Sequence, residues 1–455
     1  MVWVWLLFLS WACHGIAVVP LSEGRVSQSR DHNIVALKSG WHKIDFDKQY
    51  QHGRPPPPFD DKHTRSDTSI VVLIAALRET RLADTLVSLF SNAQHPNRVF
   101  VGVVQQNAPE DEDVVVEYCR KMGTPVQLNG TLLQQPHDCV WADHIRMHRM
   151  LASEAAGPVY ARAIGNTLVH FDQDDFCLQI DAHTVVVKGW DTLILEDWGK
   201  ANNEFAVLTT YPTNAKDLGQ STAGHWEMPH LCSLDGSRGV FMNSQAKACA
   251  NLDAPLLGVL WAAGLSFSKC HAERLVPNDI NLKGIFVGEE YSRGVRLWTH
   301  GYDFYSNSRP FIGTYYGGEK GGKSHSWKTG EIDNSHTRLR ILSKVPGYDT
   351  PEQMESLGRY QLGKQRTLEQ YIEFTGIDPR GTPDHAKFVC APVYVPWYTP
   401  PFVVAKEDRQ LRSNPSNDNG GGDKGAMVVF GGLGATFLFA VIAKLLRDSR
   451  KPRTD

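Results

Sequence analysis

Asp181 and His183 are the residues whose types and spacing first suggest chemistry. They follow the apolar run FCLQI in the stretch FCLQIDAHTVVVKGWD, residues 176–191. In an extended chain, residues two apart point the same way, so a carboxylate oxygen and an imidazole nitrogen can meet one cation. This mixed pair suits Mn²⁺ better than Ca²⁺. Such a cation would bind a nucleotide diphosphate and stabilise the charge that develops when a sugar–phosphate bond breaks.

A second group of polar residues lies in GIFVGEEYSRGVRLWTHGYDFYS, residues 284–306. A short apolar strand is expected first, and Glu289 and Glu290 then open a helix. The helix dipole favours carboxylates at that end, which is a purely structural role. The functional alternative is that one of them accepts hydrogen bonds from sugar hydroxyls. Arg296 lies on roughly the same helix face, and Asp303 would orient Arg296 or serve an acceptor.

The elements that must position these residues alternate along the chain. SIVVLIAAL, from Ser69, has the continuous apolar pattern of a strand that is buried on both faces of a parallel sheet. The further expected elements are a helix over 78–93, a strand over 98–106, a helix over 114–122, a strand over 124–129, helical spacing over 142–169 with a second helix starting at Gly157-Pro158, the strand FCLQI and a strand over 205–212.

This alternation predicts an α/β fold with an open, mostly parallel sheet flanked by helices. Ligands of such sheets bind outside the carboxyl ends of the strands, where Asp181 and His183 fall. No G-x-G-x-x-G or P-loop follows the first strand, which argues against a nicotinamide or P-loop nucleotide site. No basic run stands out in the body of the chain, so we expect no nucleic-acid partner.

The two ends of the chain predict a secretory membrane protein. Residues 2–9 are apolar and resemble a signal peptide, with an uncleaved anchor as the alternative. Residues 426–443 carry no charge, and basic residues follow, which predicts a type I orientation with a lumenal body. The predicted organisation is a signal peptide (1–20), a stem or spacer (21–68), a folded domain (69–380), a Pro/Gly-rich juxtamembrane linker (381–425), a transmembrane helix (426–446) and a cytosolic basic tail (447–455).

Within the predicted stem, Trp41 and Phe46 would allow part of it to pack on the domain instead.

The cysteine count agrees with the prediction that the body of the chain is lumenal. The chain has eight cysteines, and Cys13 would leave with the signal peptide. Seven is odd, so at least one thiol stays free or pairs with another chain. Asn129 begins one N-glycosylation sequon, which only a protein of the secretory pathway uses.

Several motifs, in this order and spacing, resemble the polypeptide α-N-acetylglucosaminyltransferases, a family that adds GlcNAc to Ser, Thr or hydroxyproline. The motifs are IRMHRMLASEAAGPVYAR (145–162), LQIDAHTVVVKGWD (178–191), VLTTYPTN (207–214), AAGLSFS (262–268), VPNDINLKGIFVGEEYSRGVRLWTHGYDFYS (276–306) and LEQYIEFTGID (368–378). The resemblance implies a GT-A fold, UDP-GlcNAc as donor, retention of configuration and dependence on Mn²⁺. Together with the predicted membrane topology, we expect a Golgi or ER location and secretory acceptor polypeptides rich in Thr or Ser.

The resemblance also implies roles for individual residues. Asp181 and His183 would bind the metal, Arg162 would lie near the donor, and Glu289 or Glu290 would lie beside the sugar and the acceptor. The turn at Leu77-Arg78-Glu79 would hold the uracil, as expected for the first turn between strand and helix.

One position departs from the pattern of related enzymes. They usually supply a third metal ligand, a His, just after the GYDFY stretch, where this chain has Thr314 in GTYYGG. A Thr hydroxyl is a poor ligand for Mn²⁺. The alternatives are that His325 replaces it, that water does, that metal affinity is low, or that activity is lost.

Two other functional classes stay open. One is a catalytically silent relative that acts as a lectin-like or chaperone-type binding protein, and Thr314 motivates it. The other is a metal-dependent hydrolase, although no second metal cluster and no G-x-S-x-G nucleophile motif accompanies it. Among transferases, UDP-GalNAc and UDP-galactose stay open as donors.

Overall fold

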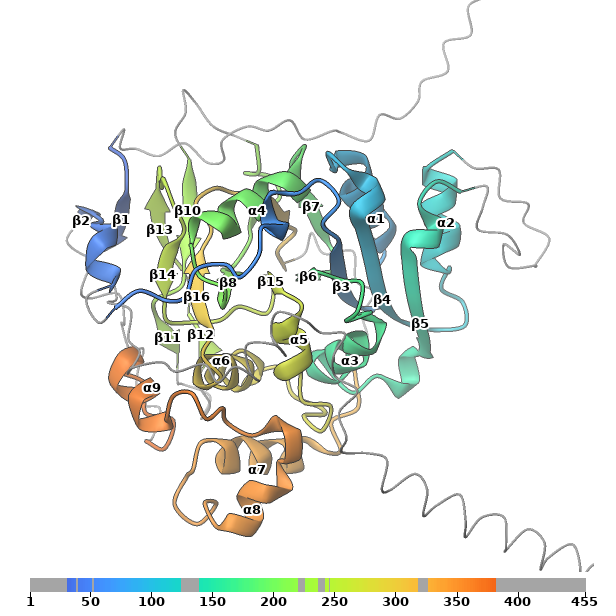
Figure 1. Cartoon of the computed structure of the whole chain (residues 1–455). Coiled ribbons are helices and arrows are strands. Elements are labelled where there is room, and N and C mark those ends of the chain that lie inside the picture. The colour runs from blue at the N-terminus through green and yellow to red at the C-terminus, as the bar shows by residue number, and fades with distance from the viewer. Residues whose placement is uncertain are drawn as a thin grey trace, which may run out of the picture. The chain divides into compact units, whose positions relative to one another are not determined.

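The computed structural model describes residues 31–37, 40–50, 53–123, 139–219, 226–235, 242–244, 246–317 and 326–381 (Figure 1). The predicted signal peptide, transmembrane helix and cytosolic tail, nearly all of the juxtamembrane linker, the sequon at Asn129 and the strand expected over 124–129 lie outside these residues. Within the described part of the chain, no helix is long and apolar enough to cross a membrane.

The centre of the domain is an eight-stranded sheet with the order β14-β16-β8-β15-β6-β3-β4-β5. Its strands are β3 (Ile70–Leu77), β4 (Val99–Asn107), β5 (Ile145–Leu151), β6 (Phe176–Asp181), β8 (Ala206–Thr209), β14 (Leu256–Gly258), β15 (Leu265–Lys269) and β16 (Asp303–Ser306).

One half of this sheet is parallel, as the apolar run after Ser69 predicted. β3 pairs in parallel with β4 on one side and with β6 on the other, and β4 pairs in parallel with β5. The register sets Ala75 of β3 opposite Asp181, the last residue of β6. The carboxyl ends of β3, β4 and β6 therefore lie side by side.

The other half of the sheet is mixed, which corrects the expectation of a mostly parallel sheet. β15 lies antiparallel to both β6 and β8, and β14 lies antiparallel to β16, whereas β16 and β8 are parallel. β15 is buried along its whole length. A short strand buried on both faces has the same residue pattern in either direction, so its sequence carries no signal for its orientation.

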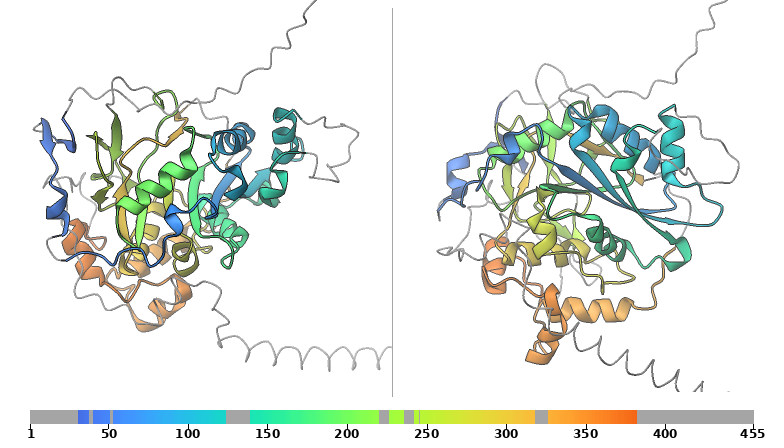
Figure 2. Two further views of the ribbon diagram at one scale, coloured as in Figure 1. Left: turned by 45° about the horizontal axis from the view of Figure 1, so that its top comes forward. Right: turned by 45° about the vertical axis from the view of Figure 1, so that its right-hand side comes forward.

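Helices cover both faces of the sheet. The helices are α1 (Leu82–Asn92), α2 (Val114–Lys121), α3 (Pro158–Gly165), α4 (Trp190–Lys200), α5 (His271–Leu275), α6 (Glu289–Thr299), α7 (Ile332–Leu342), α8 (Pro351–Ser356) and α9 (Leu368–Thr375). α1 and α4 lie on one face, and α3, α5 and α6 lie on the other (Figures 1 and 2). The 3₁₀ turns are η1 (Phe46–Tyr50), η2 (Lys62–Thr64), η3 (Pro96–Arg98), η5 (Ala142–His144), η6 (Ala152–Glu154), η7 (Asn166–Leu168) and η9 (Gly358–Tyr360).

Two elements differ from the sequence expectation. Residues 145–151 form the edge strand β5, not a helix, because pairing with β4 over its whole length overrides the helical spacing. The short strand expected before Glu289 is a loop, and α6 begins at Glu289 as predicted. The second helix of the 142–169 segment also begins where expected, at Pro158.

Three small sheets complete the domain. They are β10-β13-β1-β2, β7-β17-β9 and β11-β12. Their strands are β1 (Ile34–Leu37), β2 (Gly40–Lys43), β7 (Thr184–Val186), β9 (Thr213–Asn214), β10 (Glu227–His230), β11 (Leu234–Asp235), β12 (Met242–Asn243), β13 (Lys247–Ala250) and β17 (Ile312–Thr314). Val35 and Ile44 are buried with Met228 and Leu256, so these residues of the expected stem pack on the domain.

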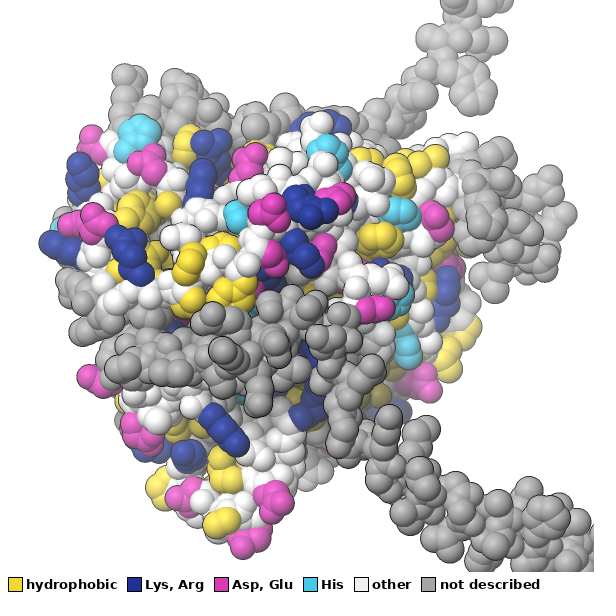
Figure 3. All heavy atoms as spheres, viewed as in Figure 1, with side chains coloured by type: hydrophobic (Ala, Val, Ile, Leu, Met, Phe, Trp, Pro, Cys, Tyr) yellow, Lys and Arg dark blue, Asp and Glu magenta, His cyan; other side chains and the backbone are white. Residues whose placement is uncertain are grey.

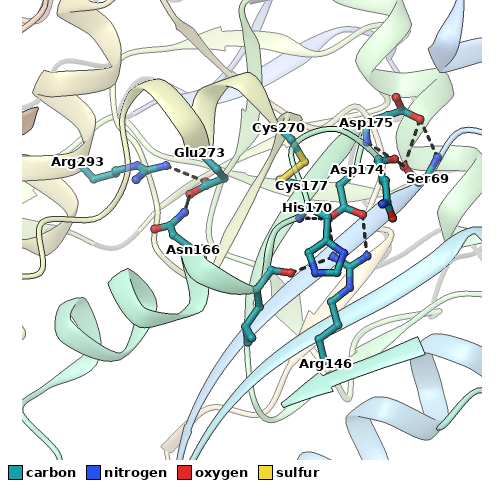
Figure 4. The surroundings of a disulfide bond; sticks show 12 residues. Ser69, Arg146, Asn166, His170, Asp174, Asp175, Cys177, Cys270, Glu273 and Arg293 are labelled. Carbon is teal, nitrogen blue, oxygen red and sulfur yellow. Dashed lines mark hydrogen bonds and ion pairs between the residues drawn. A yellow bond between two sulfur atoms is a disulfide. The ribbon is translucent and has the colours of Figure 1, made fainter. Parts of the chain in front are cut away.

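Disulfide bonds join Cys119 to Cys139 and Cys177 to Cys270. The second links β6 to the residue after β15, between the Arg146–Asp174 ion pair and Glu273 (Figure 4). Cys232 is also disulfide-bonded. Cys249 is a free, buried thiol, and burial raises its pKa. The odd cysteine count predicted at least one thiol that stays free or pairs with another chain, and Cys249 is such a free thiol.

Candidate functional site

The predicted pair lies at the carboxyl end of β6. Asp181 is the last residue of the strand, and His183 precedes β7. Oδ2 of Asp181 is 4.0 Å from Nε2 of His183. Two ligands of one cation, each about 2.1 Å from it, lie roughly 3–4 Å apart, so this separation fits a shared cation. The sequence prediction that both side chains point the same way agrees with this geometry.

Glu79, which the sequence analysis did not assign to the metal, orients His183. Its Oε2 lies 3.1 Å from Nδ1 of His183, and its side chain is only 7% exposed. A carboxylate that accepts from Nδ1–H leaves the lone pair of Nε2 toward Asp181. This is the usual arrangement behind a metal-binding histidine.

Arg162 of α3 links the two predicted constellations. Its Nη2 donates to Oδ1 of Asp181 at 2.9 Å, and its Nη1 donates to Oε1 of Glu289. Burial by itself would lower the pKa of Arg162, but Glu289 and Asp181 outweigh it and raise that pKa. Burial raises the pKa of Glu289, and Arg162 opposes part of that rise. One oxygen of Asp181 is therefore held by Arg162, and the other faces His183.

Glu290 lies in a different environment from its neighbour Glu289. Tyr211 Oη donates to Oε2 of Glu290 at 3.1 Å, and the backbone N–H of Ala263 donates to Oε1 at 3.3 Å. Burial is the main cause that raises the pKa of Glu290 to about 7. Glu290 can therefore exist in either protonation state near neutral pH. Tyr211 was visible in sequence only as part of the motif VLTTYPTN.

These groups line one cavity of about 360 Å³, which we call the edge cavity. It lies where β3, β4 and β6 end, and it also faces the first residues of α3 and α6. Its polar lining residues are Gln106, Arg162, Asp181, His183, Tyr211, Glu289 and Glu290, and its larger apolar ones are Leu77, Pro158, Met242, Phe286, Val287, Tyr316 and Trp327. The edge cavity thus brings together five of the predicted site residues.

Asp181 and His183 bring one carboxylate oxygen and one imidazole nitrogen to within 4.0 Å of each other. Within the described ranges, no group of three or more His, Cys, Asp or Glu side chains could hold one. Thr314 is buried, and its hydroxyl donates to the backbone oxygen of His183 at 3.1 Å. Thr314 therefore positions His183 and is not placed as a third ligand. His325 lies outside the described residues.

Arg78 does not line the edge cavity, although its neighbour Leu77 does. Its Nε and Nη2 donate to both oxygens of Asp111, and Nη2 also donates to Glu110. The guanidinium is thus already neutralised. The predicted uracil contact would have to come from other atoms of this turn.

Arg296 and Asp303 also lie away from the edge cavity. Arg296 is seven residues after Glu289 on α6, and seven residues advance a helix by about 10 Å. Its guanidinium is buried without a hydrogen bond, and burial followed by repulsion from Arg293 lowers its pKa to about 9. Asp303 begins β16, which is parallel to β8, so it lies at the amino end of these strands and not at the carboxyl end.

Asp303 does not orient Arg296. Its Oδ1 accepts from Arg366 and its Oδ2 accepts from Asn203, both at 2.8 Å. The sequence expectation that Arg296 and Asp303 belong to the site therefore does not match their positions.

The family comparison covers most of the domain. Residues 69–381 match the family model described as "Glycosyltransferase (GlcNAc)". A comparison with curated proteins finds no match.

One solved structure with a similar chain is the "Crystal structure of GalNAc-T7 with UDP, GalNAc and Mn2+". The two chains are 13% identical with a TM-score of 0.41, and the match covers 68% of this chain. The chain spans 55% of the length of that structure. A similarity of this size does not identify a shared activity.

Proposed function

Because this chain belongs to the GlcNAc glycosyltransferase family, we propose that it transfers GlcNAc from UDP-GlcNAc to a hydroxyl of Ser, Thr or hydroxyproline in a polypeptide. We propose further that configuration at the anomeric carbon is retained and that the cofactor is Mn²⁺. The observation that carries this proposal is the distance of 4.0 Å between a carboxylate oxygen, Asp181 Oδ2, and an imidazole nitrogen, His183 Nε2, within the edge cavity.

The chain's own residues have distinct roles in this proposal. Asp181 and His183 would hold the cation, which would stabilise negative charge on the departing diphosphate. Arg162 keeps Asp181 and Glu289 in place from the side of α3. Glu290, held by Tyr211 and the Ala263 N–H, would bind a sugar hydroxyl.

The acceptor hydroxyl would enter on the face from which UDP departs. An oxygen of the departing phosphate would take its proton, so this step requires no strong base from the enzyme. The rival mechanism is a double displacement in which a carboxylate attacks the sugar first.

We also propose a lumenal location in the Golgi or ER, with a type I membrane anchor. The disulfides Cys119–Cys139 and Cys177–Cys270 support this part, because such bonds persist in oxidising compartments and are rare in the cytosol.

A donor screen tests the proposed function. The full chain, purified in detergent, would be incubated with UDP-GlcNAc, UDP-GalNAc or UDP-galactose and with a Thr-rich or hydroxyproline peptide, in Mn²⁺ or in EDTA. We expect transfer from UDP-GlcNAc that requires Mn²⁺ and is lost in His183→Ala. Transfer that EDTA and His183→Ala leave unchanged would remove the metal assignment.

A second candidate is a binding protein that lacks catalysis. The observation that favours it is Thr314, whose hydroxyl is used on the backbone of His183 and supplies no third ligand. Binding of UDP-GlcNAc without transfer or hydrolysis, at any Mn²⁺ concentration, would favour this candidate.

A further inference from the structure

A second pocket, of about 450 Å³, opens beside the edge cavity, and we call it the side pocket. Phe286, Val287 and Trp327 line both. The side pocket continues past them to Thr329, Ile332 and His336, the last two on α7. The edge cavity and the side pocket therefore adjoin at these three residues.

The chemistry of the two spaces differs. The edge cavity is lined by Glu289 and Glu290 of α6, by Asp181 and by Arg162, whereas the described residues that line the side pocket include no Asp, Glu, Lys or Arg. Among these described residues, His336 is the one that can ionise near neutral pH. Phe286 is 61% exposed, more than any other large hydrophobic side chain in the described part of the domain. An exposed aromatic residue beside an uncharged pocket favours an apolar ligand group.

The walls of the side pocket are held in place before any ligand arrives. The backbone N–H of Gly284 donates to the oxygen of Ala156 at 2.7 Å, and that of Lys328 donates to the oxygen of Ala155 at 2.8 Å. Indole Nε1 of Trp327 donates to the oxygen of Gly284 at 3.3 Å. These bonds tie both walls to the segment before α3.

The floor of the side pocket is also fixed. Ile285 and Ile332 pack with Val159, Leu282 and Leu339 in one apolar cluster. The α7 helix therefore cannot shift away without exposing this cluster to water. The shape of the side pocket is therefore determined by the packing of this cluster.

We propose that the side pocket binds a proline or aliphatic side chain of the acceptor polypeptide, within a few residues of the hydroxyl that is glycosylated. This inference rests on the proposed function. The occupant is inferred from adjacency, because the acceptor hydroxyl must reach the sugar in the edge cavity and the rest of the peptide must leave along an adjoining surface. It is also inferred from the described lining residues, which carry no Asp, Glu, Lys or Arg and therefore disfavour an acidic or basic occupant.

Two acceptor peptides test this inference, one with prolines flanking a single Thr and one with aspartates in their place. Binding of fluorescent peptides in the presence of UDP and Mn²⁺ would be measured by anisotropy, and KM by transfer. The wild type is expected to prefer the proline peptide by about tenfold or more, as for a few apolar groups in a matching pocket.

Two substitutions place a charge in the side pocket, Thr329→Arg and His336→Asp. Each is expected to weaken binding of the proline peptide about tenfold and to leave the Kd of UDP unchanged. Asn334→Asp is the matched control, because Asn334 is an exposed residue of α7 that does not line the pocket. It should bind both peptides like the wild type.

The outcomes are distinguishable. Equal binding of the two peptides by the wild type, or no effect of either charged substitution, would overturn the inference. So would a response in which the substitutions weaken binding of a simple methyl glycoside and not of the peptide, because the occupant would then be a sugar. If the proline peptide binds as expected but no donor is transferred, the inference stands and the proposed transferase activity fails.

Discussion

At the scale of single residues, two of the predicted metal ligands, Asp181 and His183, each contact a charged side chain. Glu79 lies against Nδ1 of His183, and Arg162 lies against Oδ1 of Asp181. Both partners fix the orientation of the residue they contact, and the carboxylate of Glu79 also increases the basicity of the His183 imidazole. Metal affinity should therefore depend on Glu79, although Glu79 is not itself a ligand in this arrangement.

The first prediction concerns Glu79→Gln. The amide keeps the size of the side chain but loses the negative charge that supports His183, so we expect Mn²⁺ affinity to fall by about 10- to 100-fold. A calorimetric Mn²⁺ titration of the purified chain measures this. Glu196→Gln, at an exposed position of α4, is the control and should titrate like the wild type. An unaltered affinity in Glu79→Gln would show that the carboxylate does not support a metal ligand.

The second prediction concerns Glu290 and pH. Its pKa in the folded state is about 7, above its ordinary value of 4.5, so the folded state holds this proton more tightly than the unfolded state. This contribution to stability is fully present below about pH 4.5 and is lost as the pH rises through 7. A shift of this size corresponds to roughly 3–4 kcal/mol of unfolding free energy at most.

Glu290→Gln removes the titration. The variant should therefore gain stability relative to the wild type when the pH is raised from 5 to 8, as measured by urea unfolding at both values. Glu196→Gln should show no such change between the two values. A stability difference between Glu290→Gln and the wild type that is the same at pH 5 and pH 8 would mean that Glu290 titrates normally.

At the scale of elements, Gly157 sets the approach of α3 to the loop before α6. Its φ is +92°, and a Cβ there would lie 3.0 Å from the backbone oxygen of Ile285. Only glycine adopts this backbone conformation without strain. The residue thus allows Arg162, one turn into α3, to reach Glu289.

The third prediction compares Gly157→Ala with Gly189→Ala. Gly189 also has a positive φ, +73°, but a Cβ there meets no atom within 4 Å. Gly189→Ala should cost about 1 kcal/mol of unfolding free energy from backbone strain alone. Gly157→Ala should cost about 1–3 kcal/mol more, because its φ of +92° and ψ of 168° lie in a region that essentially only glycine adopts and because a Cβ would also meet Ile285. Urea unfolding of both variants measures the difference, and equal costs would mean that the loop moves aside freely.

The sequence identified residues of the candidate site from short local patterns, but it did not identify contacts between residues that lie far apart in the chain. Asp181 and His183 follow from strand alternation, and Glu289 and Glu290 from the start of a helix. Glu79 and Tyr211 were not assigned to their partners, because 104 and 79 residues separate them in the chain. Arg296 was assigned to the site because it shares a helix face with Glu290. It lies too far along the axis of α6 from Glu289 to line the edge cavity.

The helices and strands also differ in how far local sequence patterns predict them. β3, α1, β4 and β6 carry strong local patterns and form as predicted. β5 and the direction of β15 depend on which strand lies beside them, and a hydrophobic pattern does not encode that. The structure was therefore needed to show which strands, far apart in the sequence, pair with each other.

At the scale of the whole molecule, two disulfides constrain loops of very different length. Cys119 and Cys139 are 20 residues apart, and Cys177 and Cys270 are 93 residues apart. A crosslink stabilises the folded state mainly by restricting the unfolded chain, and it does so more for a longer loop.

On the face drawn in Figure 3, basic and acidic side chains are interspersed, so no single-sign charge patch dominates that face.

The fourth prediction is that the double variant Cys177→Ala/Cys270→Ala loses more stability than Cys119→Ala/Cys139→Ala. The expected costs are about 4–5 and about 3 kcal/mol of unfolding free energy. Urea unfolding without reductant measures both. The opposite order would mean that packing around the shorter crosslink, and not loop length, decides the stability.

The hairpin of β1 and β2 has a practical consequence for recombinant fragments. The family match starts at residue 69, yet β1 pairs with β13 and sets Val35 opposite Cys249. A fragment cut at Ser69 would leave one edge of β13 unpaired and remove part of the cover of the Cys249 thiol. Covalent dimers and precipitation should follow, whereas a fragment that keeps Asp31 onward retains its natural cover.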